Sequence, residues 1–393
     1  MNVAILTPEV QDFINGHLKT DATMLILKGV PFNEVTVQEV VEQIEAKSKS
    51  EKKLPIWFRQ PFIYYPNKLH IEQTSSEVTA QYKSGLVTGK SIIDLTGGFG
   101  IDAYYFAKHF QKITHCEWNS ELSTLVRHNY EQLDVSNITC IASDGLSYLQ
   151  NSKSTFDWIY VDPSRRHDSK GKVFFLNDCV PNVPEHLDML WSHSKNIMIK
   201  TSPLLDLTVG LSELEFVKTI HVVAVNNEVK ELLWILEHGF TGEIEIKTVN
   251  LKSQIVEHFN FFMNQESVAD ANFSKPLNFL YEPNAAILKS GGFNILTSTL
   301  SVAKLHKHSH LYTSEQLINF PGRAFEILKV IPYNKKQVKS LKIAKANITT
   351  RNFPETVQNI RNTFRIKDGG DQYLFFTTNR NHEKIVIIAN KVL

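Results

Sequence analysis

Four acidic residues in the first half of the chain each follow the end of an apolar segment. They are Asp94, Glu117, Asp144 and Asp162. In an open α/β sheet, ligands bind outside the carboxyl ends of the strands, so acids at four such ends would surround one site. A carboxylate about 20 residues beyond a glycine-rich turn, as at Glu117, can accept hydrogen bonds from both hydroxyls of a ribose. The pattern therefore predicts a site for a nucleotide cofactor.

A glycine-rich turn lies in the segment SIIDLTGGFGID, residues 91–102. Gly97, Gly98 and Gly100 would let the backbone approach a ligand closely, and the helix that follows would present N–H groups to it. Such a turn is also common as plain structure, and it is the series of acids that favours a binding role. A nicotinamide enzyme would show G-x-G-x-x-G and an all-parallel sheet, so a dehydrogenase is disfavoured.

Apolar segments alternate with helical patterns from Ser91 onward, which predicts an α/β fold with a mostly parallel sheet and helices on both faces. The predicted strands are SIIDL, KITHCEW, ITCIAS, FDWIYVD, NIMIKT and IHVVAV. A short segment containing Asn226, Asn227 and Glu228 separates VVAV from ELLWIL, and it is too short for a helical crossover. The last two strands should therefore form a hairpin that places one antiparallel strand in the sheet.

The chain resembles a known family in several motifs. The spacing Asp94-x-Thr96-Gly97-Gly98-x-Gly100, the acids at 117 and 144 and the step Asp162-Pro163 resemble the class I S-adenosylmethionine-dependent methyltransferases, whose sheet is Rossmann-like and seven-stranded. Five segments are similar to the bacterial methyltransferases that carry a THUMP-like C-terminal domain, and they span nearly the whole chain. These segments are QTSSEVTAQYK (73–83), DLTGGFGID (94–102), VDPSRR (161–166), ANITTRNFP (346–354) and KDGGDQYLFFTT (367–378).

The resemblance implies a role for each acid. S-adenosylmethionine would be the cofactor, with its methionine part on the glycine turn, its ribose on Glu117, its adenine amino group on Asp144, and the reacting region at Asp162. The cofactor-binding residues expected from it are Asp94, Thr96, Gly97, Gly98, Gly100, Glu117, Asp144 and Asp162. Thr96 departs from the family pattern, where glycine is usual, and this is tolerable if the backbone there does not need a positive φ.

The catalytic candidates are Asp162, Pro163, Ser164 and Arg165. Transfer to an exocyclic nitrogen needs in-line placement, a carboxylate or carbonyl that accepts from the amine, and exclusion of water. Asp162 and the Pro163 carbonyl could do this, although the aromatic residue usual after the prolines is missing, which leaves the target base open. Methylation at a pyrimidine C5 would need a thiolate, for which Cys179 is the one conceivable source.

Weaker candidates surround these residues. Arg165 and Arg166 could clamp a substrate phosphate or could simply pair with Asp168, and Lys200 and Asp206 are of the same kind. Upstream, a different segment suggests a helix start. Thr74 could cap a helix that carries Glu77 in its first turn, and the resemblance makes Gln73, Ser76 and Tyr82 neighbours of the cofactor site.

The sequence divides into four predicted parts. Residues 1–68 should be a helical region, 69–247 the methyltransferase domain, 248–319 a small α+β, ferredoxin-like connecting domain, and 320–393 a basic α+β, THUMP-like domain. The whole chain has a net charge of +1. Residues 321–393 contain 14 Lys and Arg against 5 Asp and Glu, so this end is basic on an acidic body.

The basic end predicts a partner. THUMP domains bind RNA, and two predicted helices (335–346 and 354–364) share the positive bias, so recognition through phosphates and RNA shape is favoured over a merely solvated face. The aromatic residues among them suggest core packing more than base stacking. The cations concerned are Lys335, Lys336, Lys339, Lys342, Lys345, Arg351, Arg361 and Arg365.

Metal, membrane and disulfide chemistry are not expected. The three cysteines are too few for a disulfide framework or a zinc cluster and suit a reducing compartment. His306, His308 and His310 would share one face of a strand, but without a cysteine or acidic partner they read as surface or phosphate-contacting histidines. No run of about 18 apolar residues and no leader pattern occurs, which predicts a cytoplasmic protein.

Together these observations predict a cytoplasmic methyltransferase that acts on a base of structured RNA, tRNA or rRNA, more readily at an exocyclic nitrogen. Two alternatives stay open. The acceptor could be a protein or a small molecule, with the basic module as a docking surface. The chain could also be a non-catalytic RNA-binding protein with a vestigial cofactor site, which the complete series of acids disfavours.

Overall fold

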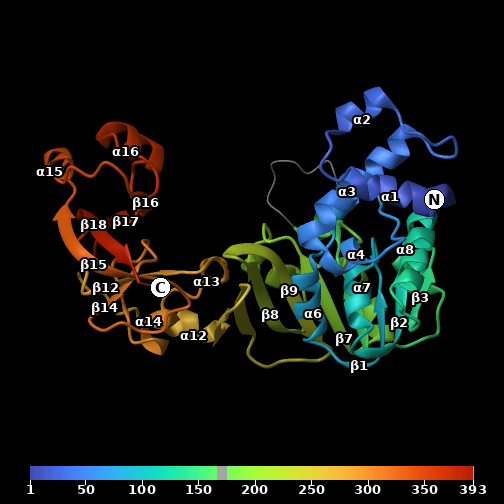
Figure 1. Cartoon of the computed structure of the whole chain (residues 1–393). Helices are drawn as coiled ribbons and strands as arrows, with labels where there is room; N and C mark the ends of the chain where they lie inside the picture. Colours follow the sequence, from blue (N-terminus) through green and yellow to red (C-terminus); the bar gives the residue numbers. More distant parts are fainter. Residues whose placement is uncertain (166–174, 393) are drawn as a thin grey trace. The chain divides into compact units, whose positions relative to one another are not determined.

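The computed structural model of the protein describes residues 1–165 and 175–392 (Figure 1). It divides into two compact units. Unit 1 comprises Met1–Lys218 and Leu233–Thr241, and unit 2 comprises Thr219–Leu232 and Gly242–Leu393. Within the described ranges, no helix is both long and apolar enough to cross a membrane.

Unit 1 begins with helices, as predicted from the apolar spacing. A capping box starts the longest of them, since the Thr36 hydroxyl accepts from the Glu39 N–H and the Glu39 carboxylate accepts from the Thr36 N–H. Their apolar sides pack around Ile5, Val10 and Val40, which are buried. The helices are η1 (Val3–Leu6), α1 (Pro8–Gly16), α2 (Ala22–Lys28), α3 (Val37–Lys53), α4 (Pro55–Arg59), α5 (Lys68–Gln73) and α6 (Glu77–Ser84).

A mixed sheet follows, with the order β11-β10-β8-β9-β7-β4-β1-β2-β3. The strands β1, β2, β3, β4 and β7 pair in parallel and are buried where they cross the core, as the apolar runs predicted. These strands are β1 (Gly89–Asp94), β2 (Phe110–Cys116), β3 (Ile138–Ile141), β4 (Trp158–Val161) and β7 (Asn196–Thr201). Their connecting helices are α7 (Ile101–Phe106), α8 (Ser120–Gln132), α9 (Gly145–Gln150), α10 (Leu187–His193) and α11 (Leu207–Glu213).

The predicted hairpin is confirmed. β8 (Val217–Val225) and β9 (Glu228–Glu237) are neighbours in the sheet, and only Asn226 and Asn227 join them. Both residues have a positive φ, 50° and 66°, which is the geometry of a tight two-residue hairpin turn and one that Asn tolerates well. Beyond it, β10 (Glu245–Leu251) pairs in parallel with β8, and β11 (Val256–Phe262) pairs antiparallel with β10. The sequence pattern did not predict this extension.

Unit 2 also holds a second sheet, with the order β13-β14-β12-β15-β18-β17-β16. Phe325, Phe375 and Phe376 are fully buried in it, so the aromatic residues of this region form a core, as expected. The strands are β12 (Phe279–Pro283), β13 (Ala303–Lys304), β14 (Tyr312–Ser314), β15 (Gly322–Pro332), β16 (Asn347–Arg351), β17 (Gln372–Thr378) and β18 (Lys384–Lys391). The helices are α12 (Met263–Val268), α13 (Ala285–Ser290), α14 (Ile295–Thr299), α15 (Lys335–Ser340) and α16 (Val357–Phe364).

The lysine-rich helix is shorter than predicted. α15 ends at Ser340 and not near residue 346, because Lys342 takes a left-handed φ of 52° that a helix cannot continue. The next helix starts at Val357, capped by the Thr356 hydroxyl, three residues later than expected. The basic residues of this region therefore lie partly on loops.

A close helix-to-strand contact fixes the far side of the sheet in unit 1. Gly210 in α11 lies against the ring of Trp234 in β9, and a Cβ added there would come within 2.4 Å of the ring. Trp234 is fully buried, and its indole N–H donates to the Thr201 hydroxyl at 3.0 Å. The ring cannot move away without losing that hydrogen bond, so the contact requires glycine.

We expect Gly210→Ala to lower the free energy of unfolding by about 1–3 kcal/mol, since the added methyl group overpacks the Trp234 ring. Gly16→Ala is the matched control. It also lies in a helix but has no atom within 4 Å of the added Cβ, so it should be neutral or stabilising by up to about 1 kcal/mol. Urea unfolding of both variants tests this, and equal effects would contradict the packing argument.

Candidate functional site

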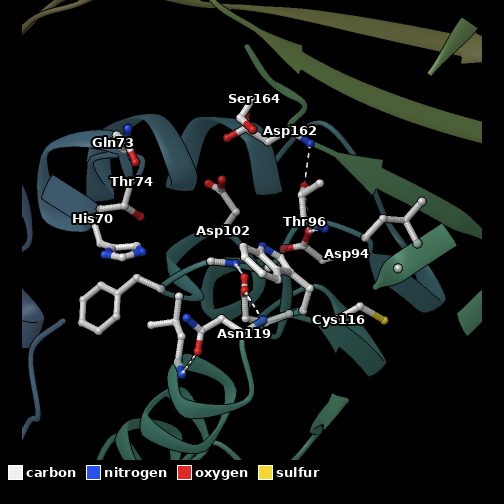
Figure 2. A pocket seen from close by; sticks show the side chains of 18 of the residues that line it. His70, Gln73, Thr74, Asp94, Thr96, Asp102, Cys116, Asn119, Asp162 and Ser164 are labelled. Atoms are coloured by element: carbon white, nitrogen blue, oxygen red, sulfur yellow. Dashed lines mark hydrogen bonds between the residues drawn. The ribbon is translucent and has the colours of Figure 1, made fainter. Parts of the chain in front are cut away.

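A pocket lies at the carboxyl ends of β1, β2 and β4 (Figure 2). It brings together most of the residues that the sequence singled out. Of those, Asp94, Thr96, Gly97, Gly98, Glu117, Asp144, Asp162 and Ser164 line it. Gly100 and Pro163 do not belong to the lining formed by the described residues, and the side chain of Arg165 lies outside the described part of the chain.

Each glycine of the turn has its own steric or conformational reason. A Cβ on Gly97 would come within 2.3 Å of the buried His115 ring, and one on Gly100 within 2.1 Å of the Tyr130 hydroxyl. Gly100 also has a φ of +79°, and Tyr130 donates to its carbonyl at 2.8 Å. Gly98 has a φ of +54° but open space where a side chain would be, with its nearest atom 3.8 Å away. Gly97 and Gly100 therefore serve packing, whereas Gly98 leaves the pocket open.

Glu117 is held by backbone N–H groups on both of its oxygens. Oε2 accepts from the Gly98 N–H at 2.9 Å and Oε1 from the Asn119 N–H at 2.8 Å. The side chain is buried, and the Asn119 amide in turn caps α8. The carboxylate is thus fixed at the pocket wall, beside the glycine turn and where a ribose was expected.

The Thr96 hydroxyl connects the ends of β1 and β4. Its oxygen lies 3.4 Å from Asp94 Oδ1, to which it donates, and accepts from the Asp162 N–H at 2.7 Å (Figure 2). The Thr96 N–H also donates to Asp94 Oδ1, at 3.0 Å. Burial raises the pKa of Asp94 well above its usual value, and the nearby carboxylates raise it further.

Asp162 forms an ion pair with Lys200 through Oδ2. Lys200 lies in β7, the strand next to β4. Its side chain is 12% exposed, compared with 33% for the side chain of Asp162. The sequence makes Lys200 a weak candidate for binding a substrate phosphate. In the structure its ammonium group instead pairs with the carboxylate of Asp162. The pair keeps one face of Asp162 toward the pocket.

A buried polar network was missed by the sequence analysis. Asp102 Oδ2 accepts from the hydroxyls of Ser75 and Tyr160, both at 2.8 Å, and Oδ1 lies 3.3 Å from the Lys83 ammonium. Burial alone would raise the pKa of Asp102, but Lys83 and Lys200 outweigh it and hold this pKa below its usual value. Figure 2 shows the Asp102 carboxylate between Thr74 and Thr96, directed into the pocket. Lys83 is the last residue of the motif 73–83 and Asp102 the last residue of the motif 94–102. Their places in these two motifs were the only sequence feature that could have pointed to the pair.

Asp144 lies at the pocket and begins α9. Its Oδ1 accepts from the Ser147 N–H at 2.8 Å, so it is the N-cap of that helix as well as a lining residue. The following Gly145 fits against the Leu95 carbonyl, which would be 2.4 Å from a Cβ. The strand end and the helix start are thereby packed closely together.

The start of α6 differs from the expectation. Ser76 is its N-cap, through a hydrogen bond from the Thr79 N–H, whereas Thr74 ends α5. Glu77 does not complete a capping box with Thr74; it is buried and accepts from the Ile56 N–H at 2.6 Å. Gln73 lines the pocket, as do His70 and Thr74, but Ser76 and Tyr82 do not.

The remaining predictions concern thiols, arginines and metal. Cys179 is buried, donates to the Phe175 carbonyl at 3.6 Å and is absent from the described pocket lining, and burial raises the pKa of the lining thiol Cys116. Burial thus disfavours the thiolate form of Cys116. Arg166 and Asp168 lie outside the described residues. Among the residues that are described, no group of three or more His, Cys, Asp or Glu side chains could hold a metal ion.

Comparison with known proteins identifies two matches to family models near the C-terminus and one relative of similar length. Residues 279–321 match a model of a ferredoxin-like domain, and residues 322–391 match a model described as THUMP domain-like. A crystal structure from Porphyromonas gingivalis W83, described as a "putative methyltransferase", is 31% identical, with a TM-score of 0.90 over 99% of this chain and 98% of that one. No match was found among curated proteins.

Two further solved structures are similar over a smaller part. A Streptococcus mutans protein described as a "putative methyltransferase" and solved in complex with SAH is 12% identical. The match covers 41% of this chain and 96% of that one, with a TM-score of 0.30. An rRNA methylase from Streptococcus thermophilus is 12% identical over 42% of this chain and 98% of its own, also with a TM-score of 0.30. The family assignment therefore rests on the Porphyromonas gingivalis protein, which is similar over the full length of the chain.

We expect Asp102→Asn to lower the free energy of unfolding by about 3–5 kcal/mol, because it removes the carboxylate beside a lysine that is fully buried. Glu237→Gln is the control, since it breaks an ion pair with Lys218 in which both side chains are more than 40% exposed and should cost less than about 1 kcal/mol. Urea unfolding measures both. Similar losses in the two variants would show that the buried pair has no special weight.

Proposed function

We propose that this chain, which belongs to the family of S-adenosylmethionine-dependent methyltransferases with a THUMP-like C-terminal domain, methylates a base of structured RNA, either tRNA or rRNA. The observation that carries the proposal is the pocket at the strand ends, where five carboxylates and the glycine turn converge. The THUMP-like match at residues 322–391 supports RNA as the acceptor.

The residues present fit the cofactor. Gly98 leaves open space at the pocket wall, and Glu117 is a buried carboxylate fixed by two N–H groups, a suitable acceptor for ribose hydroxyls. Asp144 would accept from the adenine amino group, and Asp94 and Thr96 would shape the floor. When bound, S-adenosylmethionine supplies an electrophilic methyl group on a sulfonium.

Asp162 is the proposed catalytic residue. Its Oδ2 is engaged by Lys200, which leaves Oδ1 to accept a hydrogen bond from an exocyclic amine and orient its lone pair. The Pro163 carbonyl is the second candidate acceptor, and Ser164, at the pocket lining, could contact the base. Arg165 would act on the substrate side. Holding the amine in this way supplies the positioning on which such a transfer chiefly depends.

The basic C-terminal residues support RNA binding to different degrees. Lys335, Lys336 and Lys339 are exposed on α15 and could reach phosphates. Arg351 instead pairs with the buried Glu282, and Arg361 pairs with Asp368, so these two arginines stabilise the fold. The lysines of α15 are therefore the better candidates for phosphate contact.

The proposal predicts that the purified protein transfers radiolabel from S-adenosylmethionine to an RNA band when it is given total RNA from cells that lack the gene. Asp162→Ala should abolish this transfer while cofactor affinity stays within a few-fold, because the variant loses the contact to the acceptor and the ion pair with Lys200 but keeps the glycine turn and Glu117. Label in a parallel protein extract and not in RNA would move the acceptor class. Undiminished transfer by the variant would contradict the role of Asp162.

We further expect Gly98→Leu to abolish cofactor binding, because the side chain would fill the open space at the pocket wall. Gly239→Leu is the matched control. Gly239 also has a positive φ, +78°, and open surroundings, so it bears the same backbone strain, but it does not line the pocket. Equilibrium binding of S-adenosylhomocysteine measures both, and equal affinities would place the cofactor away from the turn.

A further inference from the structure

A chain of hydrogen bonds in unit 2 fixes two histidines far apart in sequence. The His308 N–H donates to His306 Nδ1 at 3.1 Å, and His306 Nε2 lies 3.2 Å from His382 Nδ1. Asn352 adds a second hydrogen bond to His306 Nδ1, at 3.0 Å. His306 lies in the ferredoxin-like segment, whereas Asn352 and His382 lie in the THUMP-like segment. The contact therefore links two segments within one unit.

These contacts determine where the protons lie. A backbone N–H can only donate, so His306 Nδ1 is an acceptor and its proton is on Nε2. That proton is donated to His382 Nδ1, so His382 carries its own proton on Nε2. His306 is buried, and its pKa is lowered by that burial and by the neighbouring His382, His308 and lysines. His382 is exposed, and its Nε2–H is therefore an oriented donor at the surface.

The surroundings of this donor are cationic. Lys307 and His308 follow His306 directly and act on it electrostatically, Arg380 is two residues before His382, and all three are exposed, while the segment 303–312 contains no acidic residue. The turn 379–383 contains one, Glu383, whose carboxylate accepts from the Asn379 amide at 2.8 Å. Arg380 is tied at one nitrogen to the Phe273 carbonyl, at 3.2 Å, which leaves its other N–H groups directed elsewhere.

The backbone is left-handed at two of the converging positions. Asn352 and His382 have φ values of 48° and 64°, a conformation that Asn tolerates well but that costs His382 about 1 kcal/mol or more. Both deliver their side chains to His306. Strain of this kind persists where the surrounding structure enforces it, and it is typical of ligand sites.

We propose that His306, Lys307, His308, Arg380 and His382, here called the histidine surface, bind phosphate groups of the RNA substrate. The oriented Nε2–H of His382 meets a phosphate oxygen, and Lys307 and Arg380 neutralise its charge. Excess positive charge with one engaged carboxylate nearby favours a polyanion over an acidic or apolar peptide. This inference rests on the proposed function, since it names the part of unit 2 that holds the RNA.

The test measures binding of the full chain to fluorescently labelled unfractionated tRNA over a range of salt. Lys307→Gln with Arg380→Gln should lower the slope of log affinity against log salt by roughly 1.4–1.8, the value for two phosphate contacts, and reduce affinity by tenfold or more at low salt. Lys153→Gln with Lys195→Gln removes the same charge from exposed positions just before β4 and β7, at the opposite sheet edge from the pocket. This control should change affinity by less than about twofold.

A second variant tests the oriented donor itself. His382→Gly removes the ring and suits the left-handed backbone, which offsets part of the cost of leaving the buried His306 Nε2–H without its acceptor. We expect RNA affinity to fall by about fivefold or more with the salt slope almost unchanged, because the lost donor is neutral. Wild-type binding by both the double variant and His382→Gly, or an equal loss in the control, would overturn the histidine surface alone. A wild-type chain that binds no RNA would overturn the proposed function as well.

Discussion

The site depends on one hydroxyl group that links two strand ends. Thr96 Oγ1 accepts from the Asp162 N–H, and with its own backbone N–H it satisfies the buried Asp94. The position departs from the usual glycine, and this is possible because the positive φ angles of the turn fall at Gly98 and Gly100. A glycine at 96 would retain the backbone contact to Asp94 but would lose the connection to Asp162. The departure thus explains how the end of β4 is fixed next to the end of β1.

The second constraint is electrostatic. Asp94, Asp102, Glu117, Asp144 and Asp162 line one pocket, and burial together with the charges of Asp102, Asp162 and Glu117 raises the pKa of Asp94. The protein offsets this with N–H donors from loops and helix starts, and with two lysines placed on Asp102 and Asp162. The array still favours a ligand that carries positive charge, which a sulfonium does. The charges of Glu117 and Asp162 are compensated differently, by backbone N–H groups at Glu117 and by an ammonium group at Asp162.

Sequence reasoning predicted the sheet and most of the pocket because both follow from local patterns. Buried strands read as apolar runs, the two-residue turn at Asn226 and Asn227 excluded a crossover, and acids at strand ends must meet at one edge. The pairing of Lys83 with Asp102 depends on how α6 packs against α7, which no periodicity encodes. The extension by β10 and β11 was missed for the same reason, since strand order is a tertiary property.

The C-terminal region shows why net charge is a poor measure of a binding surface. Arg323 and Arg351 both bind the carboxylate of Glu282, which is only 5% exposed, so its single charge offsets one of their two positive charges and both guanidinium groups are held toward it. Side chains that keep their charge for a ligand must instead be exposed and face few acids. In unit 2 the loops around His306 and His382 meet this condition better than Arg323 and Arg351 do. Hydrogen bonds there orient the His382 ring so that its Nε2–H faces solvent. Selectivity for a phosphate then arises from orientation and not from charge alone.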